Sequence, residues 1–260
     1  FFLLSHPCIR PNDASNFIMA DKIEPAALDS DIHQLASFGI LDGLKKLVDG
    51  PPVPEGEEPD PEFQGADINA KDSRGCTPLI WACRNGHTPV AKYLLTSGAE
   101  VDAAGFGQMT PLHHACNASN ESCVQALVEA GADANKPDES GNTSLHYAVS
   151  RGVLNIVVRL TDAGADASHP NNHGSTPLHK AAISNQIAVA RKLIDLGSDP
   201  NAGDGSGDTP LHCAARCGYA GMVTCLRKGG ATEATNNDGK TPKDLADVEA
   251  GKALAEELAQ

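Results

Sequence analysis

The sequence predicts an all-α solenoid, in which short helix-turn-helix units stack one after another along a single axis. The main observation is a six-residue motif, TPLHHA at 110–115, which recurs as TPLIWA at 77, TSLHYA at 143, TPLHKA at 176 and TPLHCA at 209. These copies are 33 residues apart, and a weaker copy, TPKDLA, follows at 241. The composition agrees, because 40% apolar but only 4% aromatic residues suit thin helical layers better than a thick aromatic core.

Each copy of the motif predicts the same local structure. A turn rich in Asp, Asn and Gly comes first, as in KDSRG at 71 and KPDESG at 136. The motif Thr is then placed to cap a short helix, with Pro in its first turn, where a missing N–H costs nothing. A second helix follows, with apolar residues at helical spacing. We expect it to end at a glycine in every full unit: Gly98, Gly131, Gly164, Gly197 and Gly230.

The T-P-L-H-x-A motif at this period resembles that of the ankyrin repeat family, over roughly residues 30–260. The resemblance implies β-hairpin-like turns between the units and polar caps at both ends of the array. It also implies that the motif histidines hydrogen-bond within and between neighbouring turns: His113, His146, His179 and His212. A metal ladder along them is disfavoured, because units about 10 Å apart cannot place their ligands about 2 Å from one zinc ion.

The beginning of the chain fits no repeat unit. We expect residues 1–29 to be a disordered N-terminal segment, with a start of translation at Met19. The residues before Met19 are then a fragment or a translated upstream stretch, with a clipped remnant of a targeting sequence as the alternative. FFLL is too short for a membrane span.

The repeat domain, 30–260, is predicted to begin with a capping repeat at 30–69, in which Ser30 takes the place of the motif Thr as helix cap. That repeat contains an insertion at 51–64, PPVPEGEEPDPEFQ, whose five prolines and five acids predict a solvated loop. The loop is either a tolerated insertion or an acidic contact for a partner. Five full repeats then occupy 70–234.

The last unit, 235–260, is predicted to be a C-terminal cap. Lys243 and Asp244 replace the Leu and His of the motif, and the following residues are rich in Glu and Lys. A terminal repeat has one face in water, so it is expected to be more polar than the internal ones.

Charge and cysteine content limit the classes of partner and compartment. The net charge of −14 gives a nucleic-acid role no electrostatic support, so we expect protein partners, no membrane insertion and a monomer. The eight cysteines include no C-x-x-C pair, and Cys83 and Cys116 occupy a slot that holds small apolar residues in other units. Buried free thiols indicate a reducing compartment, the cytoplasm or the nucleus.

No motif in the sequence predicts catalysis, a cofactor or a metal. The glycine-rich run 203–208 lacks the strand of a dinucleotide fold and the Glu of a calcium loop. Cys213 and Cys217 lie four residues apart on one helix, but two ligands make a poor zinc site. We therefore expect the protein not to be an enzyme.

The resemblance implies that partners bind the turn tips and the exposed ends of the first helices. The second full repeat departs from its own pattern, because Gln108 replaces a glycine and apolar residues stand at its tip. Exposed apolar groups near arginines are typical of interaction hot spots. Our candidate partner-binding residues are Arg74, Arg84, Asn85, Phe106, Met109, Asn117, Asn142, Arg151, His173 and Arg216.

The function that this surface predicts is that of a non-enzymatic adaptor or scaffold. One alternative is an assembly or targeting chaperone, as in gankyrin-type proteins or escorts of organelle clients. The other is an inhibitor that occludes a kinase or a transcription factor.

Overall fold

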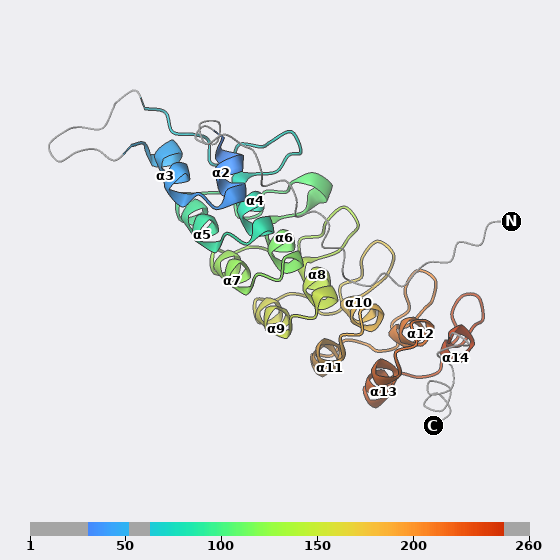
Figure 1. The fold of residues 1–260 in the computed structure, drawn as a ribbon. Helices are drawn as coiled ribbons and strands as arrows, with labels where there is room; N and C mark the ends of the chain where they lie inside the picture. Colours follow the sequence, from blue (N-terminus) through green and yellow to red (C-terminus); the bar gives the residue numbers. More distant parts are fainter. Residues whose placement is uncertain (1–30, 52–62, 247–260) are drawn as a thin grey trace.

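The computed structural model describes residues 31–51 and 63–246, and every regular element in these ranges is helical. Two parallel rows of helices run along the stack (Figure 1). One row holds the first helix of each unit: α2 (Ile32–Phe38), α4 (Pro78–Asn85), α6 (Pro111–Asn117), α8 (Ser144–Arg151), α10 (Pro177–Ile183), α12 (Pro210–Arg216) and α14 (Pro242–Leu245). The other row holds the second: α3 (Leu41–Asp49), α5 (Thr88–Thr96), α7 (Glu121–Glu129), α9 (Leu154–Asp162), α11 (Ile187–Asp195) and α13 (Ala220–Lys228).

The motif Thr begins the first helix of each full unit, as predicted. In four of the five full repeats the Thr side chain accepts the backbone N–H of the motif His, and the His side chain accepts the backbone N–H of the Thr. This reciprocal arrangement satisfies two N–H groups that a helix start otherwise leaves unpaired. The first full repeat has Ile80 in the His slot, so Thr77 caps α4 with its side chain alone.

The motif histidines also join each unit to the next. Nδ1 of each ring accepts the Thr N–H at 3.1 Å, which leaves Nε2–H as the donor. That donor reaches a backbone carbonyl of the following turn at 2.9–3.2 Å: Asn142, Ser175, Asp208 and Lys240. The predicted structural role of these histidines is confirmed.

The core is a continuous layer between the two rows of helices. The motif leucines are fully buried in all full repeats, and so are the leucines of the second helices: Leu94, Leu127, Leu160, Leu193 and Leu226. The predicted glycine stops have the left-handed φ of 85–96° that a side chain would disfavour. Seven free cysteines lie in the described residues, and all except Cys217 are buried.

The start of the array differs from the sequence prediction by one residue. The cap of α2 is Asp31, whose carboxylate accepts the N–H groups of His33 and Gln34 at 2.9 and 3.4 Å. Ser30, which the alignment with the motif Thr favoured, lies outside the described residues. The pattern was misread because Asp caps a helix as well as Ser does. Most of the 51–64 insertion, the segment 1–29 and the end of the C-terminal cap also lie outside the described residues.

Candidate functional site

The turn of the second full repeat has a backbone unlike that of the other turns. It contains a short 3-10 helix, η1 (Phe106–Gln108), in which Gly107 and Gln108 have φ of 67° and 58°. Every other full repeat has a glycine with positive φ at the position of Gln108: Gly75, Gly141, Gly174 and Gly207. Left-handed backbone is costly for a residue with a side chain. The departure noted in the sequence is therefore a real change in turn geometry.

Gly105 replaces the Asp or Asn that starts every other such turn. Asp72, in the preceding unit, accepts the backbone N–H groups of Arg74 and Cys76, both at 2.8 Å, and so holds its turn together. Gly105 has no side chain for this task. A Cβ at this position would lie 2.9 Å from Ile80 Cδ1 and 3.1 Å from Cys76 Sγ, so a side chain here would displace these two side chains of the preceding unit.

The change at Gly105 coincides with a break in the link between turns. From the third full repeat onward, each turn tip donates one backbone hydrogen bond to the tip before it: Glu139 to Gly107, Asn172 to Ser140, Gly205 to His173 and Asn237 to Ser206, at 2.8–3.0 Å. Among the described residues, no backbone bond joins the turn at 72–76 to the turn at 105–109. The first two tips are therefore not tied together.

A groove of about 610 Å³ opens where this link is missing. We call it the Phe106 groove, and its lining residues are Arg74, Cys76, Arg84, Asn85, Phe106, Met109, His114, Asn117 and Ala118. Phe106 is 76% exposed, more than any other large apolar side chain in the part of the chain that the structure describes. Arg74 and Arg84 are exposed, and Met109 is half-buried. The structure thus brings six of the ten sequence-predicted residues to one groove.

Arg74 and Arg84 give the walls of the Phe106 groove positive charge, and Trp81 helps to hold Arg84 in place. The guanidinium carbon of Arg84 lies 5.1 Å from the ring centroid of Trp81, a cation–π contact that keeps the side chain over the groove wall. Trp81 is in turn held by a 2.9 Å hydrogen bond from its Nε1 to Asp72. Burial, and then the nearby charge of Arg84, lower the pKa of His114 to about 4, so its ring is neutral near pH 7.

Two of the groove residues contact neighbouring units. Asn85 donates to the backbone carbonyl of Ser37 at 2.7 Å, which ties α4 to the capping repeat. Asn117 accepts a hydrogen bond of 2.8 Å from Nη2 of Arg151, so these two candidate residues are bonded to each other next to the groove. Arg151 itself is exposed.

The slot immediately before the motif Thr is less exposed than the family resemblance implied. Cys76, Ser175 and Asp208, which occupy it in three units, are buried, and Asn142 is half-buried. The carbonyls of Asn142, Ser175 and Asp208 accept the histidine bond from the preceding unit, which draws these residues into the stack. Cys76 makes no such bond and packs against Gly105 of the next unit instead. The exposed tip His173 lies two units beyond the Phe106 groove.

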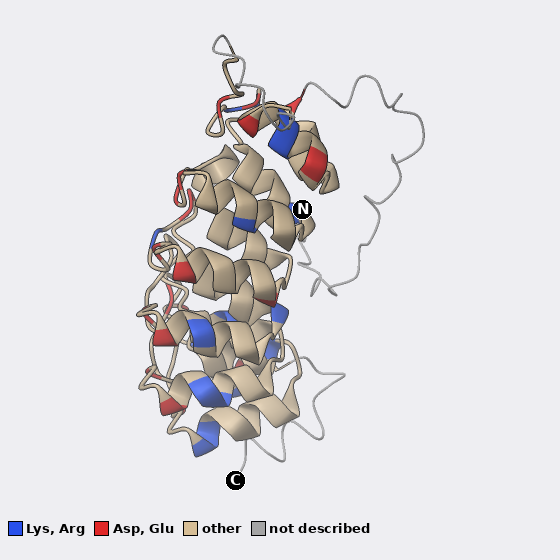
Figure 2. Cartoon of the chain, turned by 90° about the vertical axis from the view of Figure 1, so that its left-hand side faces the viewer, with Lys and Arg blue, Asp and Glu red and all other residues tan. Residues whose placement is uncertain are grey.

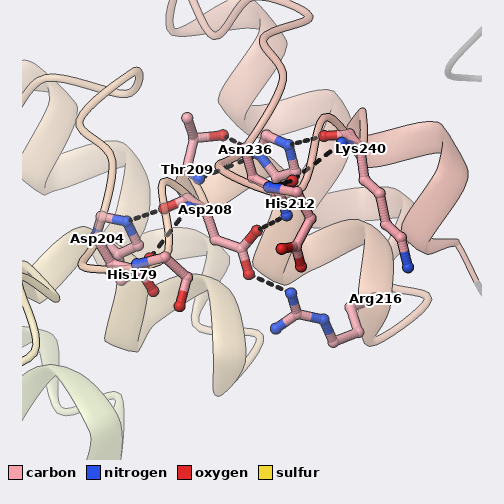
Figure 3. Close-up of polar contacts among 10 residues, drawn as sticks. His179, Asp204, Asp208, Thr209, His212, Arg216, Asn236 and Lys240 are labelled. Carbon is pink, nitrogen blue, oxygen red and sulfur yellow. Dashed lines mark hydrogen bonds and ion pairs between the residues drawn. The ribbon is translucent and has the colours of Figure 1, made fainter.

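Arg216 is at the far end of the array, where it forms an ion pair with Asp208 (Figure 3). The same carboxylate accepts a 2.7 Å bond from Asn236, and the backbone carbonyl of Asp208 accepts Nε2 of His179. Although burial opposes ionisation, the bonds from Asn236 and Arg216 hold the pKa of Asp208 below its usual range. Arg216 therefore has a partner within its own chain.

The candidate residues predicted from the sequence do not include His114, which lines the groove, or Trp81, which contacts Arg84. Both occupy the slot after the motif His, nine residues after the start of the turn. In the first and third full repeats, the residue in this slot hydrogen-bonds to the Asp that starts its own turn. Gly105 replaces that Asp in the second full repeat, and this replacement is the signal that points to His114.

The described residues hold no group of three or more His, Cys, Asp or Glu side chains that could bind a metal ion. Within the same ranges, no helix has the length and apolar character to cross a membrane.

Comparison with known proteins places this geometry in a family. The model described as ankyrin repeats in three copies matches residues 32–138 and 119–204, and the ankyrin repeat model matches 206–237. Among curated proteins, the chain is similar to mouse protein phosphatase 1 regulatory subunit 27, with 35% identity over 81 residues. That match spans 31% of this chain and 43% of the mouse protein.

Solved structures agree with the family models over most of the chain. The human ASB11 ankyrin repeat domain is 31% identical, with a TM-score of 0.75. The ankyrin repeat domain of Bcl-3, described as a unique member of the IkappaB protein family, is 26% identical, with a TM-score of 0.71. Each match covers 88% of this chain and 97% of the solved one. The chain belongs to the ankyrin repeat family.

Proposed function

We propose that this protein is a non-enzymatic adaptor or scaffold, which holds a protein partner through the first three full repeats. Ankyrin repeats generally mediate protein–protein interaction, and this chain carries them over most of its length. The observation that supports this location is the Phe106 groove, the point where the link between turn tips is broken. Exposed aromatic and Arg side chains around a hollow are typical of the few residues that contribute most binding energy.

The buried histidines support a binding role rather than a catalytic one. Burial lowers the pKa of His113, His146 and His179. In each ring Nδ1 bonds the Thr of its own unit and Nε2 bonds the next unit, so both nitrogens are used. A general acid or base needs a nitrogen that faces a substrate. These histidines therefore stabilise the stack of repeats.

A second candidate is an occluding regulator of a partner enzyme. The mouse relative is named as a regulatory subunit of a protein phosphatase, and it is 35% identical to this chain over 81 residues. This name favours regulation of a bound enzyme over the chaperone alternative. A chaperone would hold many transient clients, whereas an adaptor or a regulator holds one partner in fixed proportion.

The net charge of −14 favours a protein partner over a nucleic acid. We also propose that the chain acts as a monomer in the cytoplasm or nucleus, where its buried thiols would stay reduced.

Comparative capture from native lysate tests the proposed site. The full chain, the double variant Phe106→Ala with Arg84→Ala, and the control Ile183→Ala are used as bait. Ile183 is 46% exposed and occupies in the fourth full repeat the slot that Arg84 occupies in the first, so it is a matched position. We expect one stoichiometric protein whose recovery falls about tenfold or more with the double variant, since about 1.4 kcal/mol is tenfold in affinity.

The control Ile183→Ala should recover that protein at the wild-type level. Far-UV circular dichroism must show the same helical content for all three baits. If the double variant captures the same proteins in the same amounts, the partner does not bind at the Phe106 groove. A spread of weakly held clients instead of one protein would favour the chaperone.

A further inference from the structure

The Phe106 groove is cationic in a strongly acidic protein. Figure 2 shows acidic residues in the loops along one edge of the stack, in line with a net charge of −14. Within the described residues, neither Arg74 nor Arg84 has an ion pair, whereas Arg216 and Arg227 pair with Asp208 and Glu233. The two groove arginines are therefore left to attract a negatively charged group.

The second full repeat also lacks a carboxylate that the first and third full repeats possess. In the first full repeat Asp72 accepts Nε1 of Trp81 at 2.9 Å, and in the third Asp138 accepts the hydroxyl of Tyr147 at 2.6 Å. The second repeat has Gly105 and His114 in these two slots. Nε2 of His114 is buried and has no hydrogen-bond partner. An unpaired buried polar atom costs free energy, and a ligand that supplied its partner would recover that cost.

We propose that the Phe106 groove binds an extended acidic segment of the partner protein, a proposal that rests on the function proposed above. Carboxylates of the segment pair with Arg74 and Arg84, and an apolar side chain of the segment packs against Phe106 and Met109. Arginine suits this task because its planar guanidinium binds a carboxylate with two parallel hydrogen bonds. The volume of about 610 Å³ lies in the usual range of ligand sites.

The surroundings of the groove also determine where the acidic and the apolar residues of the segment lie. Glu139, at the turn tip of the third full repeat, lies beside Gly107: its N–H donates to the carbonyl of Gly107 at 2.9 Å, and its Oε2 is 4.0 Å from the position of a Cβ on Gly107. A carboxylate on that side would be repelled by Glu139. The acidic residues of the segment therefore lie toward the first full repeat, and the apolar residue lies between them and Glu139.

A peptide panel tests this chemistry on the full chain. Four fluorescent peptides of equal length are compared by anisotropy: one with Asp and Glu on one side of a Leu, one with Gln in place of the acids, one with Lys in their place, and one acidic peptide with Ser in place of Leu. We expect the acidic Leu peptide to bind about tenfold or more tighter than the other three. Its affinity should fall as salt is added, because exposed charge pairs are screened.

Two variants assign the charge preference to the groove. Arg74→Gln with Arg84→Gln should remove the preference for acid over Gln, whereas Arg191→Gln, an exposed arginine on α11, should preserve it. If the Gln or Lys peptide binds as tightly as the acidic Leu peptide, or if no peptide binds, the proposal that the groove binds an acidic segment is overturned. The proposed function is judged separately by the capture experiment: it fails if the Phe106→Ala, Arg84→Ala variant still captures the partner, or if a spread of weakly held clients replaces the single partner.

Discussion

Acidification from neutral pH to about pH 5 is expected to lower the free energy of unfolding by about 2–4 kcal/mol. The cause is the set of buried histidines. Burial lowers the pKa of His146 to about 4, and that of His114 to about 4 as well. Burial also lowers the pKa of His113 and His179. In addition, a proton on Nδ1 of His113, His146 or His179 would abolish the acceptor of the Thr N–H.

The sign of this change in stability follows from the pH at which the folded and the unfolded state each bind protons. In the unfolded chain a histidine takes up its proton near pH 6.5, whereas His146 in the folded chain does so only near pH 4. Between these values the unfolded state holds more protons, so stability falls as the pH falls. The loss begins near pH 6.5 and is complete near pH 4.

Urea unfolding followed by circular dichroism, at several pH values between about 8 and 5, measures this dependence. Stability should stay level above about pH 7, and the slope below it should correspond to uptake of about two or more protons on unfolding. Equal stability at pH 7 and pH 5 would show that the histidines are not held neutral by the fold.

Replacement of His179 by Ala is expected to destabilise the protein by about 2–4 kcal/mol. The side chain is fully buried and makes three contacts: with the N–H and the hydroxyl of Thr176 at 3.1 and 2.9 Å, and with the carbonyl of Asp208 at 2.9 Å. Its loss leaves the N–H of Thr176 unpaired beside a cavity, and the carbonyl of Asp208 keeps only its bond from the N–H of Asp204. The link between the fourth and fifth full repeats would be the first to weaken.

The matched control is Lys180→Ala, the next residue on the same helix, which is only partly buried. We expect its effect to stay within about 0.5 kcal/mol. Urea unfolding of both variants at pH 7 is the measurement. If His179→Ala costs no more than Lys180→Ala, the histidine bonds between units contribute little to the fold.

The repeat architecture could be predicted from sequence because each of its parts is local and recurs. A Thr cap, a Pro in the first turn and a terminal glycine act within one unit, and five copies repeat the same pattern. The unusual second turn was also visible, through Gln108. The start of the array was misplaced by one residue, because Asp31 and Ser30 are both good caps and only the folded backbone selects between them.

The details of the candidate site could not be predicted, because they depend on distances between units. The ion pair of Arg216 with Asp208 and the bond of Arg151 to Asn117 form between side chains whose approach no local pattern encodes. The burial of Cys76 follows from packing of its turn on the next unit, which the sequence does not show. Gly105 is a further sign of the groove in the sequence, but its meaning required the Asp72–Trp81 contact for comparison.

Site-specific photo-crosslinking tests most directly whether a protein partner docks in the Phe106 groove. A benzophenone amino acid replaces Phe106 in one form of the full chain and Ile183 in a second, and both are irradiated with the captured partner bound. We predict a strong crosslink from position 106, to a partner segment rich in Asp and Glu, and little product from position 183. Equal crosslinking from the two positions, or none from position 106 while the partner remains bound, would contradict the account.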